Sequence, residues 1–269
     1  MSDFLKTMAA SSRARADAVG RRFTDDELDR PVFPLELRGF DLIAEIKNRS
    51  PAEGELSVGA GDHAGRARQY VTGGAAAISV LTEPDRFDGE LSHLEAVVDA
   101  VAKDAVPVMR KDFLVDPVQV LEAKAAGASG VLLIAAMLDV DGLKTMLDCA
   151  FEHDLFVLLE SFDDADLELT AQLVEQPQYA RQVERNKLLA GVNTRNLRTL
   201  AVDPDRLRRL GPSLPGGTVC VAESGLHTAE DAAAVTGWGY RMALVGTALM
   251  RAADPAKLIA DMLAAGRAA

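Results

Sequence analysis

The sequence predicts an α/β protein in which an all-parallel β-sheet is covered by helices, and two observations lead to that class. Short, nearly continuous apolar runs alternate with helical patterns along most of the chain. Strands that are apolar on both faces are typical of parallel sheets, because helices cover both faces. There are eight such runs, and eight strand–helix units are the number that closes a (β/α)8 TIM barrel.

The strands and helices are expected in strict alternation. The apolar runs that predict strands lie at residues 42–47, 76–82, 107–111, 130–135, 155–160, 188–193, 218–223 and 242–246. The helical patterns that follow them lie at residues 62–73, 91–102, 117–126, 138–150, 163–185, 203–210, 228–236 and 254–265. The fifth unit is long, so residues 175–187 predict an extra turn or a second short helix before the sixth strand.

Several helix starts carry a capping residue or a proline in the first turn, which is the usual signature of a helix N-terminus. These starts are at Asp116-Pro117, Asp203-Pro204, Thr228 and Asp254-Pro255.

Residues 1–40 precede the first strand and begin with a predicted amphipathic helix, from Asp3 to about Val19, whose apolar face includes Phe4. No linker or low-complexity segment divides the rest of the chain. We therefore expect one (β/α)8 barrel domain over residues 1–269, with residues 1–40 as an N-terminal helical extension. An open, doubly wound sheet is the alternative, although no glycine-rich dinucleotide fingerprint follows the first strand.

Composition limits the partners that this protein is expected to have. The formal net charge of −12 argues against nucleic acid or an anionic membrane as a partner. Cys149 and Cys220 have neither metal-site nor redox spacing, which is typical of a reducing cytoplasm. The four histidines share no spacing, and we interpret them as solvated or structural. We therefore expect a cytoplasmic protein, a monomer or weak homo-oligomer, that needs no metal or other cofactor.

The third expected strand ends in a lysine with apolar neighbours. Alternation along the strand places Met109, Lys111 and Phe113 on one face and Arg110 and Asp112 on the other. A lysine desolvated in this way can have a lowered pKa and act as an acid or as a nucleophile. The alternative is an ion pair that only holds a loop.

Ionisable or amide side chains recur where other expected strands end. The residues that share this position are Glu45, Lys47, Lys111, Glu160, Asn193, Arg195 and Glu223. In a (β/α)8 barrel these ends meet at one mouth, where the chemistry of such barrels collects. Burying unpaired charge is costly, so their convergence predicts a site for acid–base chemistry rather than a structural feature.

Two strand-to-helix junctions carry a glycine and a hydroxyl side chain. These are Glu223-Ser224-Gly225 and Val245-Gly246-Thr247, and Ser50 in the first loop offers a third hydroxyl. The loops after the seventh and eighth strands of such barrels commonly bind phosphate through backbone N–H groups. Ordinary turn formation is the alternative for each glycine, but both junctions together favour a phosphate site.

Taken together, these segments resemble the indole-3-glycerol phosphate synthase family of tryptophan biosynthesis. The resemblance covers most of residues 40–252 in order, in the segments 43–47 with 50–51, 81–83 with 87 and 89, 107–113, 191–193 with 195–197, 222–225 and 244–246. It implies a substrate, 1-(2-carboxyphenylamino)-1-deoxyribulose 5-phosphate. The implied products are indole-3-glycerol phosphate, CO₂ and water, and the family carries an extra helix before its barrel.

The resemblance also implies roles for the site residues. Lys111 would be the general acid at the C2′ carbonyl oxygen, and Glu160 its partner acid or base in dehydration. Lys47 would contact the substrate carboxylate, and Glu45 would orient and tune the lysines. The other implied roles are positioning by Asn193, Arg195 and Glu223, phosphate binding by Ser50, Ser224, Gly225, Gly246 and Thr247, and walls for the aromatic ring from Phe87 and Phe113.

The chain departs from the usual family pattern at Ala52-Glu53, Glu90, Ser161-Phe162 and Thr194. Two other kinds of protein remain open. One is another phosphosugar-binding barrel enzyme, either an isomerase or an aldolase that forms a Schiff base on Lys111. The other is a non-catalytic phosphate-binding paralogue, which we expect to have lost a catalytic group.

Overall fold

The computed structural model describes residues 3–20, 22–50, 54–56 and 62–269. Eight parallel strands form a closed barrel in the order β1-β10-β9-β8-β7-β6-β5-β4. They are β1 (Asp41–Ile46), β4 (Ala77–Leu81), β5 (Val108–Lys111), β6 (Gly130–Ile134), β7 (Phe156–Ser161), β8 (Leu188–Asn193), β9 (Val219–Glu223) and β10 (Met242–Val245). The (β/α)8 barrel is confirmed, and the open doubly wound sheet is wrong.

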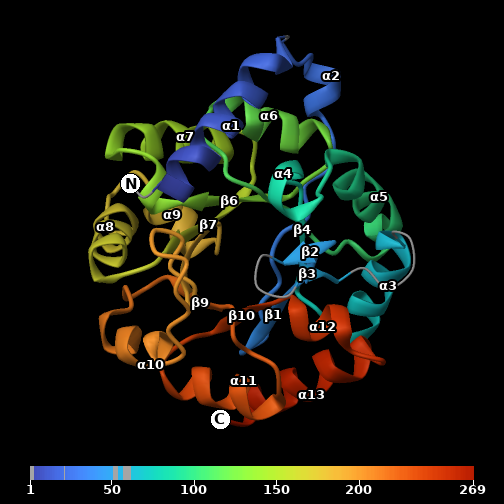
Figure 1. Ribbon diagram of the computed structural model, residues 1–269, viewed down its shortest axis with the longest axis vertical. Helices are drawn as coiled ribbons and strands as arrows, with labels where there is room; N and C mark the ends of the chain where they lie inside the picture. Colours follow the sequence, from blue (N-terminus) through green and yellow to red (C-terminus); the bar gives the residue numbers. More distant parts are fainter. Residues whose placement is uncertain (1–2, 21, 51–53, 57–61) are drawn as a thin grey trace.

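Helices form a ring outside the barrel (Figure 1). The helices between or after barrel strands are α3 (His63–Gly73), α5 (Leu91–Val101), α6 (Pro117–Ala125), α7 (Val140–Glu152), α8 (Asp164–Val174), α10 (Arg206–Leu210), α11 (Ala229–Gly237) and α13 (Pro255–Ala268). Shorter elements are α2 (Asp25–Leu28), α4 (Pro84–Phe87), α9 (Ala180–Glu184), α12 (Thr247–Arg251), and the hairpin of β2 (Arg49–Ser50) and β3 (Gly54–Glu55).

Three of the expected helix starts are confirmed by their capping contacts. Asp116 and Thr228 each form a capping box, in which the cap side chain and the third helical residue bond each other's backbone. The carboxylate of Asp254 accepts from the N–H of Lys257 at 2.9 Å. The long fifth unit contains α8 and a second short helix, α9. This second helix is one of the two alternatives predicted for residues 175–187.

The expected start at Asp203-Pro204 is wrong, because α10 begins at Arg206. Val202 pairs with Arg195 in an isolated antiparallel bridge, which keeps the chain extended up to that point. The Asp203 carboxylate then accepts from the N–H of Asp205 at 3.1 Å and closes a turn before the helix. Asp203 therefore closes a turn instead of capping the helix, because tertiary pairing delays the helix start.

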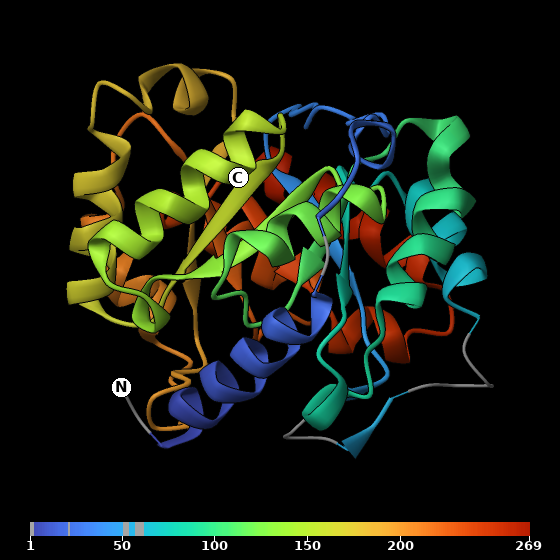
Figure 2. The same ribbon diagram turned by 90° about the horizontal axis from the view of Figure 1, so that it is seen from above.

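Helix α1 (Asp3–Val19) has the expected bounds and lies across one end of the barrel, beside α6 (Figures 1 and 2). Its buried residues Leu5 and Met8 belong to the same apolar cluster as Phe113 and Ile134. Arg15 binds the buried carboxylate of Asp112 through two hydrogen bonds of 2.8 Å. The helix therefore packs on the barrel at the end where β5 and β6 finish.

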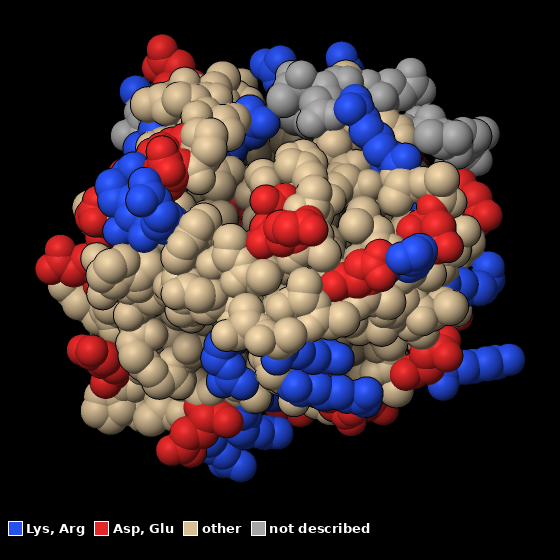
Figure 3. Space-filling view, turned by 90° about the horizontal axis from the view of Figure 1, so that it is seen from below, with Lys and Arg blue, Asp and Glu red and all other residues tan. Residues whose placement is uncertain are grey.

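Charges of both signs are mixed over the surface seen in Figure 3, where Lys and Arg side chains lie beside Asp and Glu. On the described part of that face they do not gather into one basic field. Within the described ranges, every helix is too short or too polar to cross a membrane.

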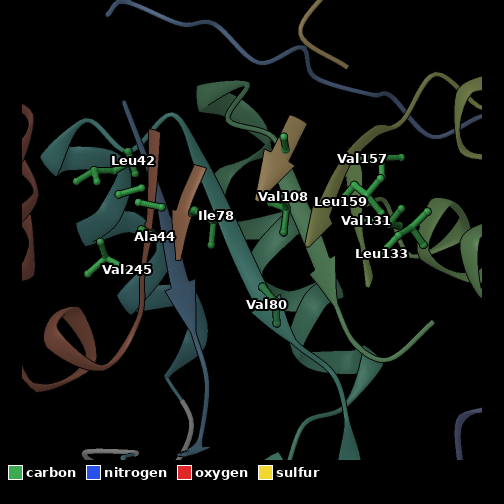
Figure 4. Close-up of a cluster of buried hydrophobic side chains, with 14 of the residues drawn as sticks. Leu42, Ala44, Ile78, Val80, Val108, Val131, Leu133, Val157, Leu159 and Val245 are labelled. Carbon is green, nitrogen blue, oxygen red and sulfur yellow. The ribbon is translucent and has the colours of Figure 1, made fainter. Parts of the chain in front are cut away.

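Two apolar layers hold the barrel together. The outer layer packs between strands and helices (Figure 4) and includes Leu42, Ala44, Ile78, Val80, Val108, Val131, Leu133, Val157, Leu159 and Val245. The inner layer fills the barrel and includes Ile43, Met109, Leu132, Leu158 and Val221. Side chains alternate along a strand, so residues two positions further on face the same way. Glu45, Lys111, Glu160 and Glu223 lie two positions after Ile43, Met109, Leu158 and Val221. Their side chains therefore face the interior of the barrel as well.

Candidate active site

A cavity of about 480 Å³ opens beyond the inner apolar layer, at the carboxyl ends of the strands. Of the site residues that the sequence predicts, those that line this cavity are Glu45, Lys47, Phe87, Lys111, Phe113, Glu160, Asn193, Arg195, Glu223, Ser224, Gly225, Gly246 and Thr247. Ser50 belongs to β2, and its side chain lies outside what the structure describes, as do Ala52 and Glu53.

Glu45 connects the two lysines of the cavity. The Oε2 atom of Glu45 lies 2.5 Å from the Nζ of Lys47, and its Oε1 atom lies 3.9 Å from the Nζ of Lys111. On its other side, the Lys111 Nζ lies 3.8 Å from Oε2 of Glu160. The side chains of Glu45 and Glu160 are almost fully buried, so these charges interact with little screening by water.

The carboxylates set the protonation of Lys111. Burial pushes the pKa of Lys111 down, but attraction to the neighbouring carboxylates, chiefly Glu160 and Glu45, more than offsets it, and the pKa rises above its ordinary value. Burial likewise raises the pKa of Glu45, yet Lys47 and Lys111 hold it below its ordinary value overall. Lys111 is therefore charged at neutral pH, and the lowered pKa expected of a desolvated lysine alone is not found.

Asn193 fixes the orientation of Glu160. The backbone N–H of Arg195 donates to Oδ1 of Asn193 at 2.9 Å, and in an amide side chain only the oxygen can accept such a bond. The amide nitrogen of Asn193 therefore points the other way, and it donates to Oε2 of Glu160 at 3.2 Å. Asn193 faces inward because side chains alternate along β8. It thereby orients the Glu160 carboxylate on the neighbouring strand β7.

Aromatic rings form one wall of the cavity. The Phe113 ring lies 6.0 Å from that of Phe4 in an edge-on arrangement and 6.2 Å from that of Phe87. Leu132, Ile134, Leu197 and Leu200 extend the apolar lining. Phe4 was predicted on the apolar face of α1 but not in the site, because a helical pattern does not show what lies opposite it.

The junction after β9 turns sharply at the mouth of the cavity. Ser224 and Gly225 both have positive φ, 68° and 78°. A serine in the left-handed region is strained, and such strain is most often found at functional sites. Thr194, which the sequence analysis noted only as a departure, is buried and lines the cavity nearby. Its hydroxyl oxygen has no hydrogen-bond partner among the described residues, so it is available to a ligand.

Gly246 lies against the charge cluster. A Cβ atom added there would meet Oε2 of Glu45 at 2.1 Å and Nζ of Lys47 at 2.9 Å. The absence of a side chain at Gly246 therefore makes room for the Glu45–Lys47 ion pair. The sequence pattern at Gly246 predicts only a phosphate role, because it shows a strand-to-helix junction but not the neighbouring strand.

The departure at Ser161-Phe162 forms part of an anchor for the loop between β8 and α10. Phe162 is fully buried, and the Arg198 guanidinium lies 5.9 Å from the centre of its ring. Arg198 also binds Asp166 through two nitrogens, at 2.7 and 2.5 Å, and Asp163 at 2.8 Å. This loop carries Leu197 and Leu200 into the cavity wall, so Arg198 fixes that wall to the start of α8.

Two histidines that the sequence treats separately lie together. The rings of His63 and His93 are 4.2 Å apart, and His93 accepts from the backbone N–H of Glu90 at 3.2 Å, which explains the departure at Glu90 as a helix cap. His227 lines the mouth of the cavity, which the sequence did not indicate. Across the described ranges, no three His, Cys, Asp or Glu side chains gather as a metal-holding group.

The fold and the cavity define a (β/α)8-barrel enzyme whose site combines acid–base groups with an aromatic wall. A family model described as indole-3-glycerol phosphate synthase matches residues 34–262. The chain therefore belongs to the indole-3-glycerol phosphate synthase family.

Curated relatives of that name are similar over most of their length. The protein from Nocardioides sp. is 44% identical over 232 residues, which cover 85% of this chain and 83% of the relative. The protein from Methanopyrus kandleri is 44% identical with 85% of each chain covered, and that from Mycobacterium sp. strain KMS is 36% identical over 99% of this chain and 94% of its own.

Among solved structures, 3-hexulose-6-phosphate synthase from Salmonella typhimurium is similar with a TM-score of 0.62. The match covers 84% of this chain and 98% of that one. At 16% sequence identity it supports the barrel fold alone.

Proposed function

We propose that this protein converts 1-(2-carboxyphenylamino)-1-deoxyribulose 5-phosphate to indole-3-glycerol phosphate, CO₂ and water in tryptophan biosynthesis. The observation that carries the proposal is the cluster of Lys111, Glu160, Glu45 and Lys47 in one cavity. Ring closure needs a proton donor at the C2′ carbonyl oxygen, and dehydration needs both an acid and a base. Family membership supports the same reaction.

Lys111 acts as the general acid during ring closure. Its raised pKa keeps it protonated at neutral pH, which suits an acid and does not suit an amine nucleophile. Lys47 receives the substrate carboxylate, and Glu45 holds both ammonium groups in place. When the carboxylate leaves as CO₂, one negative charge disappears from the cavity, so each turnover consumes one proton.

Glu160 takes part in the dehydration that completes the indole ring. Asn193 holds it through Oε2, and Lys111 lies near the same oxygen. Asn193, Arg195 and Glu223 position the substrate around this group. Fixed orientation of the reacting groups supplies much of the catalytic effect in a reaction that bends its substrate onto itself.

The remaining lining residues hold the two ends of the substrate. Phe87 and Phe113 form a wall for the anthranilate ring, and the wall excludes water from it. The phosphate lies at the junctions after β9 and β10 and is held by Ser224, Gly225, Gly246 and Thr247, with Ser50 from the first loop. Thr194, whose buried hydroxyl is unpaired among the described residues, adds a donor at that end.

An aldolase that forms a Schiff base on Lys111 is less favoured. Imine formation needs a neutral amine, and the carboxylates around Lys111 stabilise its charged form. A non-catalytic paralogue is expected to have lost a catalytic group, whereas the five proposed catalytic side chains are present.

The whole chain is proposed to be one barrel domain in the cytoplasm, acting as a monomer or weak homo-oligomer on a small phosphorylated substrate. Leu5 and Met8 pack in the inner apolar cluster, which supports treating residues 1–40 as part of the barrel domain. Cys149 and Cys220 are both free thiols, which suits a reducing compartment.

The direct test is a fluorescence assay for the indole product with purified protein and the carboxyphenylamino-deoxyribulose phosphate. Product formation with stoichiometric CO₂ release is expected. Borohydride is added in parallel, and trapping of substrate on the protein would favour the aldolase. A folded protein that binds the substrate but forms neither indole nor CO₂ would contradict the proposed function.

A further inference from the structure

Two buried carboxyl groups of the site, those of Glu223 and Glu160, lie on either side of strand β8. Glu223 and Glu160 are 1% and 0% exposed. Both carboxyl oxygens of Glu223 and the Oε1 atom of Glu160 have no hydrogen-bond donor among the described residues. Buried polar atoms in proteins are almost always paired, so three unpaired oxygens in one place need an explanation.

The other groups around the pair do not supply the missing donor. Asn193 and Lys111 are both directed at Oε2 of Glu160. Gly191, on the strand between the two glutamates, leaves the space that the Glu223 carboxyl occupies, since a Cβ there would lie 2.1 Å from Glu223 Oε1. Gly191 is the direct strand partner of Glu160, so the Glu223 carboxyl that occupies this space lies beside the Glu160 carboxyl.

We propose that Glu223 carries a proton at neutral pH and shares it with Glu160, so that the pair supplies both the acid and the base of the dehydration step. This proposal rests on the proposed function. A proton on Glu223 makes its carboxyl a hydrogen-bond donor, and Oε1 of Glu160 can accept that bond. The two facing oxygens are then paired. Two carboxyl groups that share a site commonly hold one proton in this way.

The charges that face Glu223 support this arrangement. They come from Glu160 on β7, Lys111 on β5 and Glu45 on β1. Burial and the neighbouring carboxylates raise the pKa of Glu223 well above its ordinary value, although Lys111 opposes them. With Glu223 neutral, the two lysines are balanced by the two remaining carboxylates.

The proton balance of dehydration matches a pair that holds one proton. The C2′–O bond breaks, and the hydroxyl leaves as water with the proton from Glu223. The C1′–H bond breaks, its electrons form the C1′–C2′ double bond, and the proton goes to Glu160. After the step the pair again holds one proton, now on Glu160, and transfer back to Glu223 restores the starting state.

The test uses Glu223→Gln, which keeps the shape and a hydrogen-bond donor but has no proton to give. In a single turnover, the substitution should slow indole formation about a hundredfold more than it slows CO₂ release. An infrared difference spectrum at neutral pH should show a protonated carboxyl band in the wild type that the variant lacks. Glu223→Asp, which keeps an ionisable group, should recover part of the indole rate.

Indole formation at the wild-type rate in Glu223→Gln would overturn the proposal, as would the absence of a protonated carboxyl band in the active wild type. Loss of CO₂ release together with indole formation would also overturn it, because the defect would then precede dehydration. A wild type that forms no indole would instead refute the proposed function.

Discussion

At the scale of single residues, Glu45 determines how the two lysines behave. It contacts Lys47 and Lys111 through different oxygens, and its charge is one of the causes of the raised pKa of Lys111. A general acid must be protonated to act, so its pKa sets the alkaline limit of activity. With Lys111 as the proposed general acid, its raised pKa is expected to extend activity towards high pH.

Glu45→Gln should move that alkaline limit to lower pH. The variant removes one of the negative charges that stabilise the charged form of Lys111, so the pKa of Lys111 falls. The measurement is the pH profile of kcat for wild type and variant. An alkaline limb at the same pH in both proteins would show that Lys111 does not set it.

Gly246→Ala should lower kcat by about tenfold or more, in the range of one impaired acid–base group. The new Cβ would displace the Glu45 carboxylate from Lys47, with which it lies in contact. Gly237→Ala is the matched control, because a Cβ there meets nothing within 4 Å. A variant with normal kcat and only a raised KM would assign Gly246 to phosphate binding alone.

At the scale of elements, the loop from β8 to α10 depends on one arginine. Leu200 has a positive φ of 61° and is 48% exposed at the cavity mouth, so the loop holds a strained apolar residue in an unfavourable place. Arg198 binds the loop to Asp163 and Asp166 at the start of α8. This bidentate contact keeps the apolar wall in position for the substrate.

Arg198→Met should raise KM about tenfold and change kcat by less than about threefold, because it loosens the wall without touching the acid–base groups. Arg198→Lys should recover little, since an ammonium group does not reproduce two parallel hydrogen bonds. Steady-state kinetics on both variants, with the exposed Arg208→Met as control, make the test. An unchanged KM in a folded Arg198→Met protein would contradict this role.

At the scale of the whole molecule, the N-terminal helix and the barrel are joined through a buried charge. Asp112 is fully buried and accepts hydrogen bonds from Arg15, Thr82 and the Phe113 backbone. Burial raises the pKa of Asp112, but Arg15 and Arg110 outweigh burial and hold it below its ordinary value. The residue that follows Lys111 thus ties α1 to the active-site strand.

Arg15→Met should lower the free energy of unfolding at neutral pH by about 2 kcal/mol, typical of hydrogen bonds to a charged group. Because the pKa of Asp112 is lower in the folded protein, its charge stabilises the fold fully above the pKa of an unfolded aspartate, about 3.9. This stabilisation is lost as the pH falls through the pKa of Asp112 in the folded protein. The difference between wild type and variant in urea unfolding should therefore begin to shrink only below about pH 4, and it should keep shrinking as the pH falls through the lower folded pKa of Asp112. Lys6→Met, on the exposed face of α1, is the control, and a pH-independent difference would contradict the account.

The sequence predicts much of this molecule because its strands are uniform apolar runs. Most predicted strand limits lie within one or two residues of those observed, and α1 has the same bounds in both. Alternation also predicts which face of β5 carries Lys111. Closure of the barrel then brings the polar strand ends into one cavity, as the count of eight units leads one to expect.

The contacts that the sequence does not indicate join residues far apart in the chain. Arg198 meets Asp166, Gly246 makes room for Glu45, and His63 meets His93. Local periodicity carries no information about which loops lie side by side, so these pairs require the fold. The delayed start of α10 has the same cause, because the bridge from Arg195 to Val202 overrides a local helix signal.

The most direct test of the account is the turnover of Lys111→Ala beside that of Lys257→Ala. Lys257 is a surface lysine whose ammonium group pairs with Asp261 at 2.7 Å. The account predicts that Lys111→Ala forms indole product about 10²–10⁴ times more slowly than wild type, while Lys257→Ala is unaffected. Near-normal turnover in a folded Lys111→Ala protein would contradict the central role given to this residue.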